Sequence, residues 1–189
     1  NDALEKFENE ERVMQISGYM FPVDLSNTKT DAFFLSFTSS WGWATWKRSW
    51  DTFDEIAQGV EILAKDEDLK KKFDLNNSYP YFKMLLDQKK GKVDSWAIRF
   101  YLSVFLNNGL VLYPKKTLVN NTGFDGSGTH CKNDINQTVL DDDFKTTIFP
   151  KKVEDEDKNK DKISYFFKKQ NNIFIKTFSF IIDKFKIIC

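Results

Sequence analysis

Short apolar runs that alternate with a helical pattern constrain the fold of this chain more than any other feature. Val13–Ser17 and Ala32–Thr38 are typical of strands. The apolar positions of Trp96–Asn108 recur at helical spacing over about four turns and stop at an Asn-Gly pair, a common helix end. Leu110–Tyr113 and Thr117–Asn120 then resemble two more short strands. The pattern predicts an α/β fold, a mixed sheet with flanking helices.

Two further helices are expected between these runs. Residues 60–74 carry a dense charge run, which is typical of a solvated helix face. Tyr81–Lys90 follows Pro80, which suits a first helical turn, and Gly91 closes the segment.

Tryptophan is concentrated in one segment, since four of the five tryptophans lie within residues 41–50. Their flat apolar faces with one polar group suit ligands that have C–H faces and hydroxyl rims, as sugars do. Trp41 and Trp43 flank Gly42 before a helix is established, so helical periodicity does not explain them. These three residues are the better ligand candidates.

The same segment also fits a structural interpretation. From Ser39 onward a helix start is expected, because serine is a good N-cap and aromatic residues then recur on one helical face. A buried core stripe would account for this pattern. The residues on that face are Trp43, Trp46, Trp50 and Phe53.

Composition excludes several classes of protein. The 28 basic and 28 acidic residues balance, so the field of the whole chain gives no reason to expect a nucleic-acid partner. Cys131 and Cys189 have neither disulfide-framework nor zinc-ribbon spacing, which favours a reducing compartment and thus a cytoplasmic protein. We see neither a signal-peptide pattern nor an apolar run of the roughly 18 residues that a spanning helix needs.

Charge divides the chain unevenly. Residues 151–189 hold ten lysines against six acidic residues. We expect a body over residues 1–135, a charged linker over 136–162 and a basic amphipathic helical tail over 163–189. The acidic runs at 141–143 and 154–157 are assigned to solvated linker rather than to a metal site. The tail fits peripheral contact with a membrane or partner as well as packing on its own core. Its apolar stripe consists of Phe174, Phe178, Ile181, Ile182 and Phe185.

A glycine-rich loop precedes the linker. Gly126, Ser127 and Gly128 lead to His130, the one histidine of the chain, so the backbone can approach a ligand beside an imidazole. The loop matches neither a P-loop nor a dinucleotide fingerprint. A surface turn with an incidental histidine is the alternative.

The order of these motifs resembles the carboxyl-terminal half of a GT-A glycosyltransferase, in particular bacterial sugar transferases with a WGWATW-type segment. The likeness covers roughly residues 10–131. The segments that carry it are ISGYMFP (16–22), SSWGWATWKRSW (39–50), DSWAIRFY (94–101) and LYPKKTLVNNTGFDGSGTH (112–130).

The resemblance implies a nucleotide-sugar donor and a glycan or lipid-linked acceptor, as in polysaccharide biosynthesis. In the family, an amino-terminal Rossmann-like half holds a divalent metal, Mn²⁺ or Mg²⁺, through an Asp-x-Asp motif. That half is not in this sequence, so we expect residues before Asn1 in the complete protein. The present chain would carry the acceptor side and would be inactive alone.

Chemistry assigns roles to the remaining residues. An inverting transfer needs a base for the acceptor hydroxyl, and Asp94 matches the family's acidic residue before a helix, although Ser95 follows where two adjacent acids are common. A simple helix cap is the alternative role for Asp94. Arg99 is a candidate for contact with the departing diphosphate, and a solvent-exposed surface charge is its alternative role. His130 is a candidate metal or diphosphate contact.

Lys47 and Arg48 are two more candidates for contact with the diphosphate, but the sequence favours a solvent-exposed surface charge for each of them. Three functions therefore stay open: a glycosyltransferase acting near the inner membrane face, a non-catalytic carbohydrate-binding module, and an interaction protein recruited through its basic tail.

Overall fold

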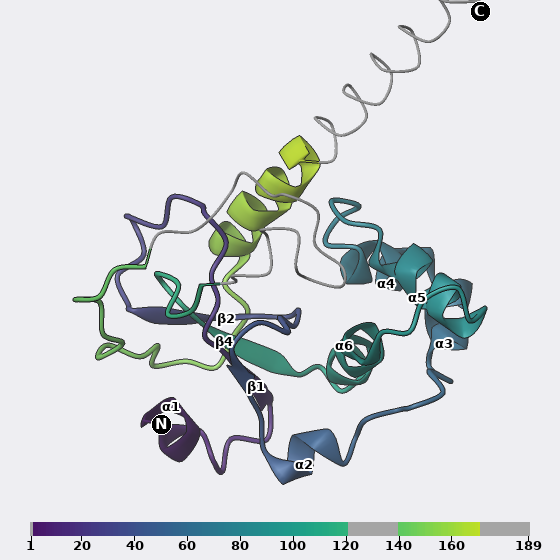
Figure 1. The fold of residues 1–189 in the computed structure, drawn as a ribbon, viewed down its shortest axis with the longest axis horizontal. Coiled ribbons are helices and arrows are strands. Elements are labelled where there is room, and N and C mark those ends of the chain that lie inside the picture. The colour runs from purple at the N-terminus through teal and green to yellow at the C-terminus, as the bar shows by residue number, and fades with distance from the viewer. Residues whose placement is uncertain (1, 121–139, 171–189) are drawn as a thin grey trace, which may run out of the picture.

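The computed structural model describes residues 2–120 and 140–170, and a four-stranded mixed sheet forms its centre (Figure 1). The strand order is β2-β4-β1-β3. The central strands β1 and β4 are parallel, whereas β2 and β3 join as antiparallel edges. The predicted α/β class with a mixed sheet is confirmed. The strands are β1 (Val13–Ser17), β2 (Ala32–Leu35), β3 (Trp43–Ala44) and β4 (Leu110–Pro114).

Helices flank this sheet. Figure 1 shows α3, α4 and α5 gathered at one side of the molecule, with α6 between them and the sheet. A further helix covers residues 157–170. The other helices are α1 (Asp2–Lys6), α2 (Lys47–Trp50), α3 (Val60–Lys65), α4 (Glu67–Phe73), α5 (Tyr81–Lys89) and α6 (Trp96–Leu106).

Strand alternation divides the core between the two faces of the sheet. Phe33 and Leu35 join the larger cluster, which contains residues of α3 to α6 and of the helix 157–170. Ala32 and Phe34 point to the smaller cluster, which includes Phe7 near α1. All five residues of β4 are buried, as expected for a central strand covered on both faces.

Local signals explain why α6 begins and ends where it does. The Ser95 side chain accepts a hydrogen bond from the Ile98 N–H and caps the helix. Asn108 adopts a left-handed φ of 52° after the helix, and the Gly109 N–H donates to the Val104 carbonyl at 2.8 Å. The chain then turns directly into β4. The predicted helix and the strand after it are confirmed.

Two elements differ from the sequence expectation. The helix expected over residues 60–74 is two helices, because Asp66 takes an extended conformation and caps α4 by accepting from the Leu69 N–H. Thr117–Asn120 is not a strand. Its Leu118 N–H donates to the Gly18 carbonyl at 2.7 Å, so this segment touches the end of β1 without extending the sheet.

The predicted helix from Ser39 is wrong. Trp43 lies in β3, paired with Ser17 of β1, and α2 begins only at Lys47. Trp46 before it is extended, with φ −104° and ψ 157°. The free edge of β1 offers backbone partners that the aromatic pattern does not reveal, and this pairing pulls the segment straight. Trp43, Trp46, Trp50 and Phe53 therefore do not share one helical face.

Residues 140–156 of the expected linker lie along the body rather than apart from it. The Asp31 carboxylate accepts hydrogen bonds from the Thr147 and Ile148 N–H groups at 3.0 and 2.8 Å. Asp155 forms a parallel bridge with Phe34 of β2. In the helix that follows, Ile163 and Phe167 are buried in the larger core cluster. The start of the expected tail is thus part of the packed body, while residues 171–189 lie outside the described structure.

Asp31 provides a test of this attachment. Hydrogen bonds from Ile148 and then from Thr147 hold the pKa of the Asp31 carboxyl below its usual value. A lowered native pKa stabilises the fold above the unfolded pKa of about 3.9 and loses that effect as pH falls through the native value. We expect Asp31→Ala to lower the urea midpoint at pH 7, with the difference from the parent shrinking below about pH 4. A difference independent of pH would contradict the role of the carboxylate charge.

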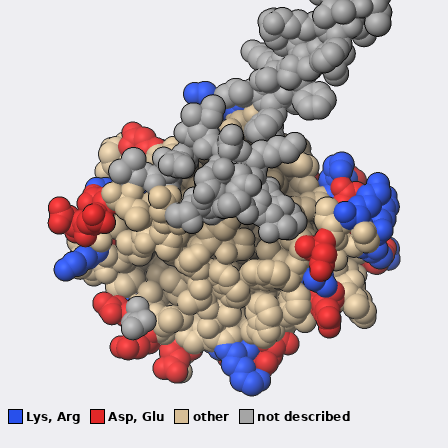
Figure 2. All heavy atoms as spheres, in the orientation of Figure 1, with Lys and Arg blue, Asp and Glu red and all other residues tan. Residues whose placement is uncertain are grey.

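Charged side chains lie around the rim of the face shown in Figure 2, and uncharged side chains occupy its middle. Both signs occur along the visible rim, so the described part of this face has no continuous basic stripe of the kind that tracks a nucleic-acid backbone.

Candidate functional site

Five aromatic rings from four parts of the chain meet beside the edge strand β3. Trp43 lies 5.1 Å from Trp96 and 6.0 Å from Trp50, measured between ring centroids. Trp50 stacks on Phe53 at 4.9 Å with an interplanar angle of 17°. Phe100 lies 5.8 Å from Trp43 and 5.3 Å from Trp50. We call Trp43, Trp50, Phe53, Trp96 and Phe100 the aromatic platform.

The platform has a buried base and an open surface. Phe100 is only 1% exposed, whereas Trp50 and Trp96 are 39% and 38% exposed. Large rings that remain this open cost free energy in water and are typical of binding surfaces. The exposed parts of Trp50 and Trp96 therefore form an apolar surface above the buried Phe100 ring, and such a surface is suited to contact with a ligand.

Asp94 lies two residues before Trp96, at the amino end of α6. Its side chain is 93% exposed and its Oδ1 accepts from the Arg99 Nη2 at 3.2 Å. Ser95, not Asp94, caps the helix, so the helix-cap role considered for Asp94 is wrong. The Asp94 carboxylate is thus open to solvent, paired with Arg99 and only two residues from Trp96 of the aromatic platform.

Arg99 ties this carboxylate to the platform. Its Nε donates to the Ser95 carbonyl at 3.3 Å and its Nη1 donates to the Glu55 carbonyl at 2.9 Å. The guanidinium carbon lies 5.8 Å from the centroid of the Phe53 ring, within cation–π range. Three of its nitrogens are engaged within the described structure. Arg99 is therefore better suited to positioning Asp94 than to binding a diphosphate.

Trp41 and Gly42 lie next to the platform in sequence but make other contacts. The Trp41 ring packs edge-on against Tyr19 at 4.5 Å. Gly42 has a left-handed φ of 53°, and its carbonyl accepts from the Gly18 N–H at 2.6 Å. Of the three predicted ligand residues of the segment, the structure places Trp43 in the platform, Trp41 against Tyr19 and Gly42 in the turn between them.

The neighbouring cations, Lys47 and Arg48, make contacts within the fold. Lys47 pairs with Asp51 at 2.7 Å across one turn of α2. The Arg48 guanidinium donates to the Phe7 and Glu8 carbonyls at 3.1 Å each and lies 4.4 Å from the Trp46 ring. Desolvation lowers the pKa of Arg48. Arg48 therefore fastens the amino-terminal segment to α2.

Several predicted positions fall outside the described residues, namely Gly126, Ser127, Gly128 and His130. Across residues 2–120 and 140–170 we find no group of three or more His, Cys, Asp or Glu side chains placed to hold a metal ion. In the same ranges no helix is both long and apolar enough to cross a membrane.

Sequence reasoning missed the exposed surfaces of two platform residues. The aromatic pattern favours a core position for Trp50, and Trp96 belongs to an apolar helical face, so neither pattern indicates that these rings are partly open to solvent. The signal that was present is positional: Trp96 is the first residue of α6, directly after the Asp94-Ser95 pair, and a first-turn side chain often lies at the rim of a core rather than inside it.

Comparisons of the chain with family models, with curated proteins and with solved structures return no match.

Proposed function

We propose that this chain is the acceptor-side part of a nucleotide-sugar-dependent glycosyltransferase of GT-A type, with the aromatic platform as the acceptor subsite. The observation that carries the proposal is an exposed carboxylate, Asp94, at the border of a partly open tryptophan surface. Tryptophan faces stack on the C–H faces of sugars, and a carboxylate accepts the proton of a hydroxyl.

In the proposed transfer, the acceptor hydroxyl is the nucleophile and Asp94 is the base. The acceptor hydroxyl oxygen attacks the anomeric carbon and forms the new C–O bond, while Asp94 takes the hydroxyl proton. The bond between the anomeric carbon and the diphosphate oxygen breaks, and the nucleoside diphosphate leaves with the electron pair. Arg99 positions Asp94 through the 3.2 Å contact. The resemblance assigns the divalent cation and the nucleotide to the amino-terminal half of such enzymes, with His130 as a further contact.

Asp94→Asn in the full-length protein tests this role. We expect transfer from a panel of nucleotide sugars with Mn²⁺ to fall by about 100-fold in kcat, the usual contribution of a general base. The unfolding midpoint should not move, because the side chain is 93% exposed. The matched control is Asp51→Asn, which removes the charge of another exposed, ion-paired carboxylate, directly after α2. Unchanged transfer by Asp94→Asn would contradict the assignment.

One observation favours a second function, non-catalytic binding of carbohydrate. Asp94 is already paired with Arg99, and the platform presents its tryptophans without help from that carboxylate. A binding module would retain glycan affinity in Asp94→Asn and would show no transfer in the parent. Calorimetry with glycan acceptors, beside the transfer assay, separates the two functions.

A further inference from the structure

A hollow of about 690 Å³ lies at the β2 edge of the sheet, between residues 27–34 and residues 150–162. It is separate from the aromatic platform, which borders β3 at the opposite edge. Its size lies in the range of small-molecule sites. Two glutamates line it, Glu154 and Glu156, against five lysines: Lys29, Lys151, Lys152, Lys158 and Lys162.

The positive charge of this lysine hollow is largely uncompensated. Lys152 lies 4.0 Å from Glu154, at the limit of an ion pair. Lys29, Lys151 and Lys158 are exposed, and none of them forms an ion pair with another residue of the described ranges. The nearby carboxylates of Asp155 and Asp157 are held by Lys160, at 2.5 and 2.8 Å. An excess of cations therefore faces the hollow.

Fixed polar groups also line the hollow. Asn159 is buried, and its amide and the Thr28 hydroxyl exchange hydrogen bonds at 3.1 and 3.2 Å. The amino end of the helix 157–170 borders the same space through Lys158 and Asn159, and a helix amino end carries partial positive charge. Lysines around a preformed polar wall suit an anion with several oxygens.

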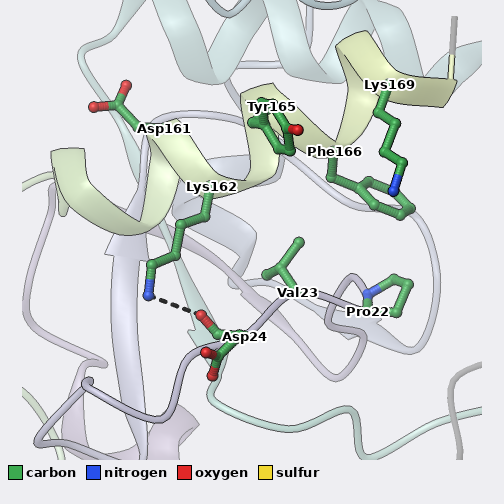
Figure 3. Close-up of a pocket in the computed structure, with 8 residues that line it drawn as sticks. All are labelled: Pro22, Val23, Asp24, Asp161, Lys162, Tyr165, Phe166 and Lys169. Atoms are coloured by element: carbon green, nitrogen blue, oxygen red, sulfur yellow. Dashed lines mark hydrogen bonds between the residues drawn. The ribbon is translucent and has the colours of Figure 1, made fainter.

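A neighbouring hollow of about 510 Å³ provides an internal comparison (Figure 3). Lys162 lies between the two and donates to the Asp24 carbonyl at 2.8 Å. In the second hollow, Lys162 and Lys169 are matched by Asp24 and Asp161. Its charges balance, whereas lysines outnumber glutamates in the lysine hollow.

We propose that the lysine hollow binds a phosphate-bearing group, either a free phosphate ester or pyrophosphate, or the headgroup of an anionic lipid. The two sources share the same chemistry: several phosphate oxygens accept charge-assisted hydrogen bonds from Lys29, Lys151 and Lys158. This inference does not depend on glycosyl transfer, because the residues that carry it lie at the other edge of the sheet.

The test uses the full chain and two probes. Inorganic pyrophosphate is titrated by calorimetry, and flotation is measured with vesicles of phosphatidylcholine with and without phosphatidic acid. We expect Lys151→Gln/Lys158→Gln to weaken binding about tenfold, since each lost charge-assisted hydrogen bond removes part of the affinity. The matched control, Lys71→Gln/Lys72→Gln, removes two exposed lysines of α4 and should change binding less than about twofold.

Each outcome decides the proposal. Pyrophosphate binding that the hollow variant weakens supports a free phosphate ligand. Vesicle binding that requires phosphatidic acid and is weakened by the same variant supports a lipid headgroup. Failure of both probes to bind overturns the proposal. Equal weakening by the hollow variant and by the α4 control overturns it as well, since binding would then follow total charge alone.

Discussion

Phe100→Ala is expected to destabilise the protein by about 4 kcal/mol, as removal of a buried phenylalanine ring does elsewhere. Phe100 is 1% exposed and forms the buried base of the platform, in contact with Trp43, Trp50 and Phe53. Its loss leaves a cavity under rings that are already partly open to water. We therefore expect the tryptophans to lose their fixed arrangement as well as the fold to lose stability.

Two measurements separate these effects. Urea unfolding gives the loss of stability, and near-ultraviolet circular dichroism reports the packing of the five tryptophans of the chain. Three of them, Trp43, Trp50 and Trp96, belong to the platform. Phe73→Ala is the matched control. Phe73 is fully buried and packs on Tyr81, Tyr101 and Phe105, none of which belongs to the platform.

We expect the control variant to lose similar stability but to keep the tryptophan dichroism while folded. If the function proposed above holds, Phe100→Ala also loses glycan affinity and Phe73→Ala does not. A cost of less than about 1 kcal/mol for Phe100→Ala, below that of most buried truncations, would show that the platform is not built on this ring.

The elements that follow local rules could be predicted from the sequence. The Val13–Ser17 strand, the Tyr81 helix and the helix from Trp96 to its Asn-Gly stop all carry their own signals of periodicity, cap and turn. Asp94 and Arg99 lie on one such helix start, so their proximity followed from short-range spacing. The parts of the candidate site that depend on a single helix were therefore accessible.

Long-range pairing explains the rest. Trp43 is straightened by pairing with Ser17, and Trp96 reaches it from a helix more than fifty residues later. The attachment of Thr147 to Asp31 spans 116 positions. Composition identifies residues 136–162 only as a charged segment. Their own sequence does not indicate that Thr147 and Ile148 donate hydrogen bonds to Asp31. The same reason hides the lysine hollow, which combines Lys29 with Lys151 and Lys158.

Gly18→Ala should disrupt the junction that holds β3, at a cost of about 3 kcal/mol or more. A Cβ at Gly18 would lie 2.6 Å from the Gly42 carbonyl oxygen and 3.2 Å from a methyl carbon of Val119. The nearest atom is backbone, so relief requires the Gly42 turn to move away from β1. That movement breaks the 2.6 Å hydrogen bond from the Gly18 N–H and shifts Trp43, which is next in the chain.

Gly91→Ala is the control that separates collision from backbone strain. Gly91 has a φ of 67°, and an added Cβ there meets nothing within 4 Å. Its cost is therefore the left-handed strain alone, about 1 kcal/mol. In thermal unfolding, Gly18→Ala should lower Tm clearly more than Gly91→Ala and should also shift tryptophan emission. An equal decrease in Tm for the two variants would mean that the close approach of Gly18 to Gly42 tolerates a methyl group. The position of Trp43 would then depend on the aromatic platform rather than on this glycine turn.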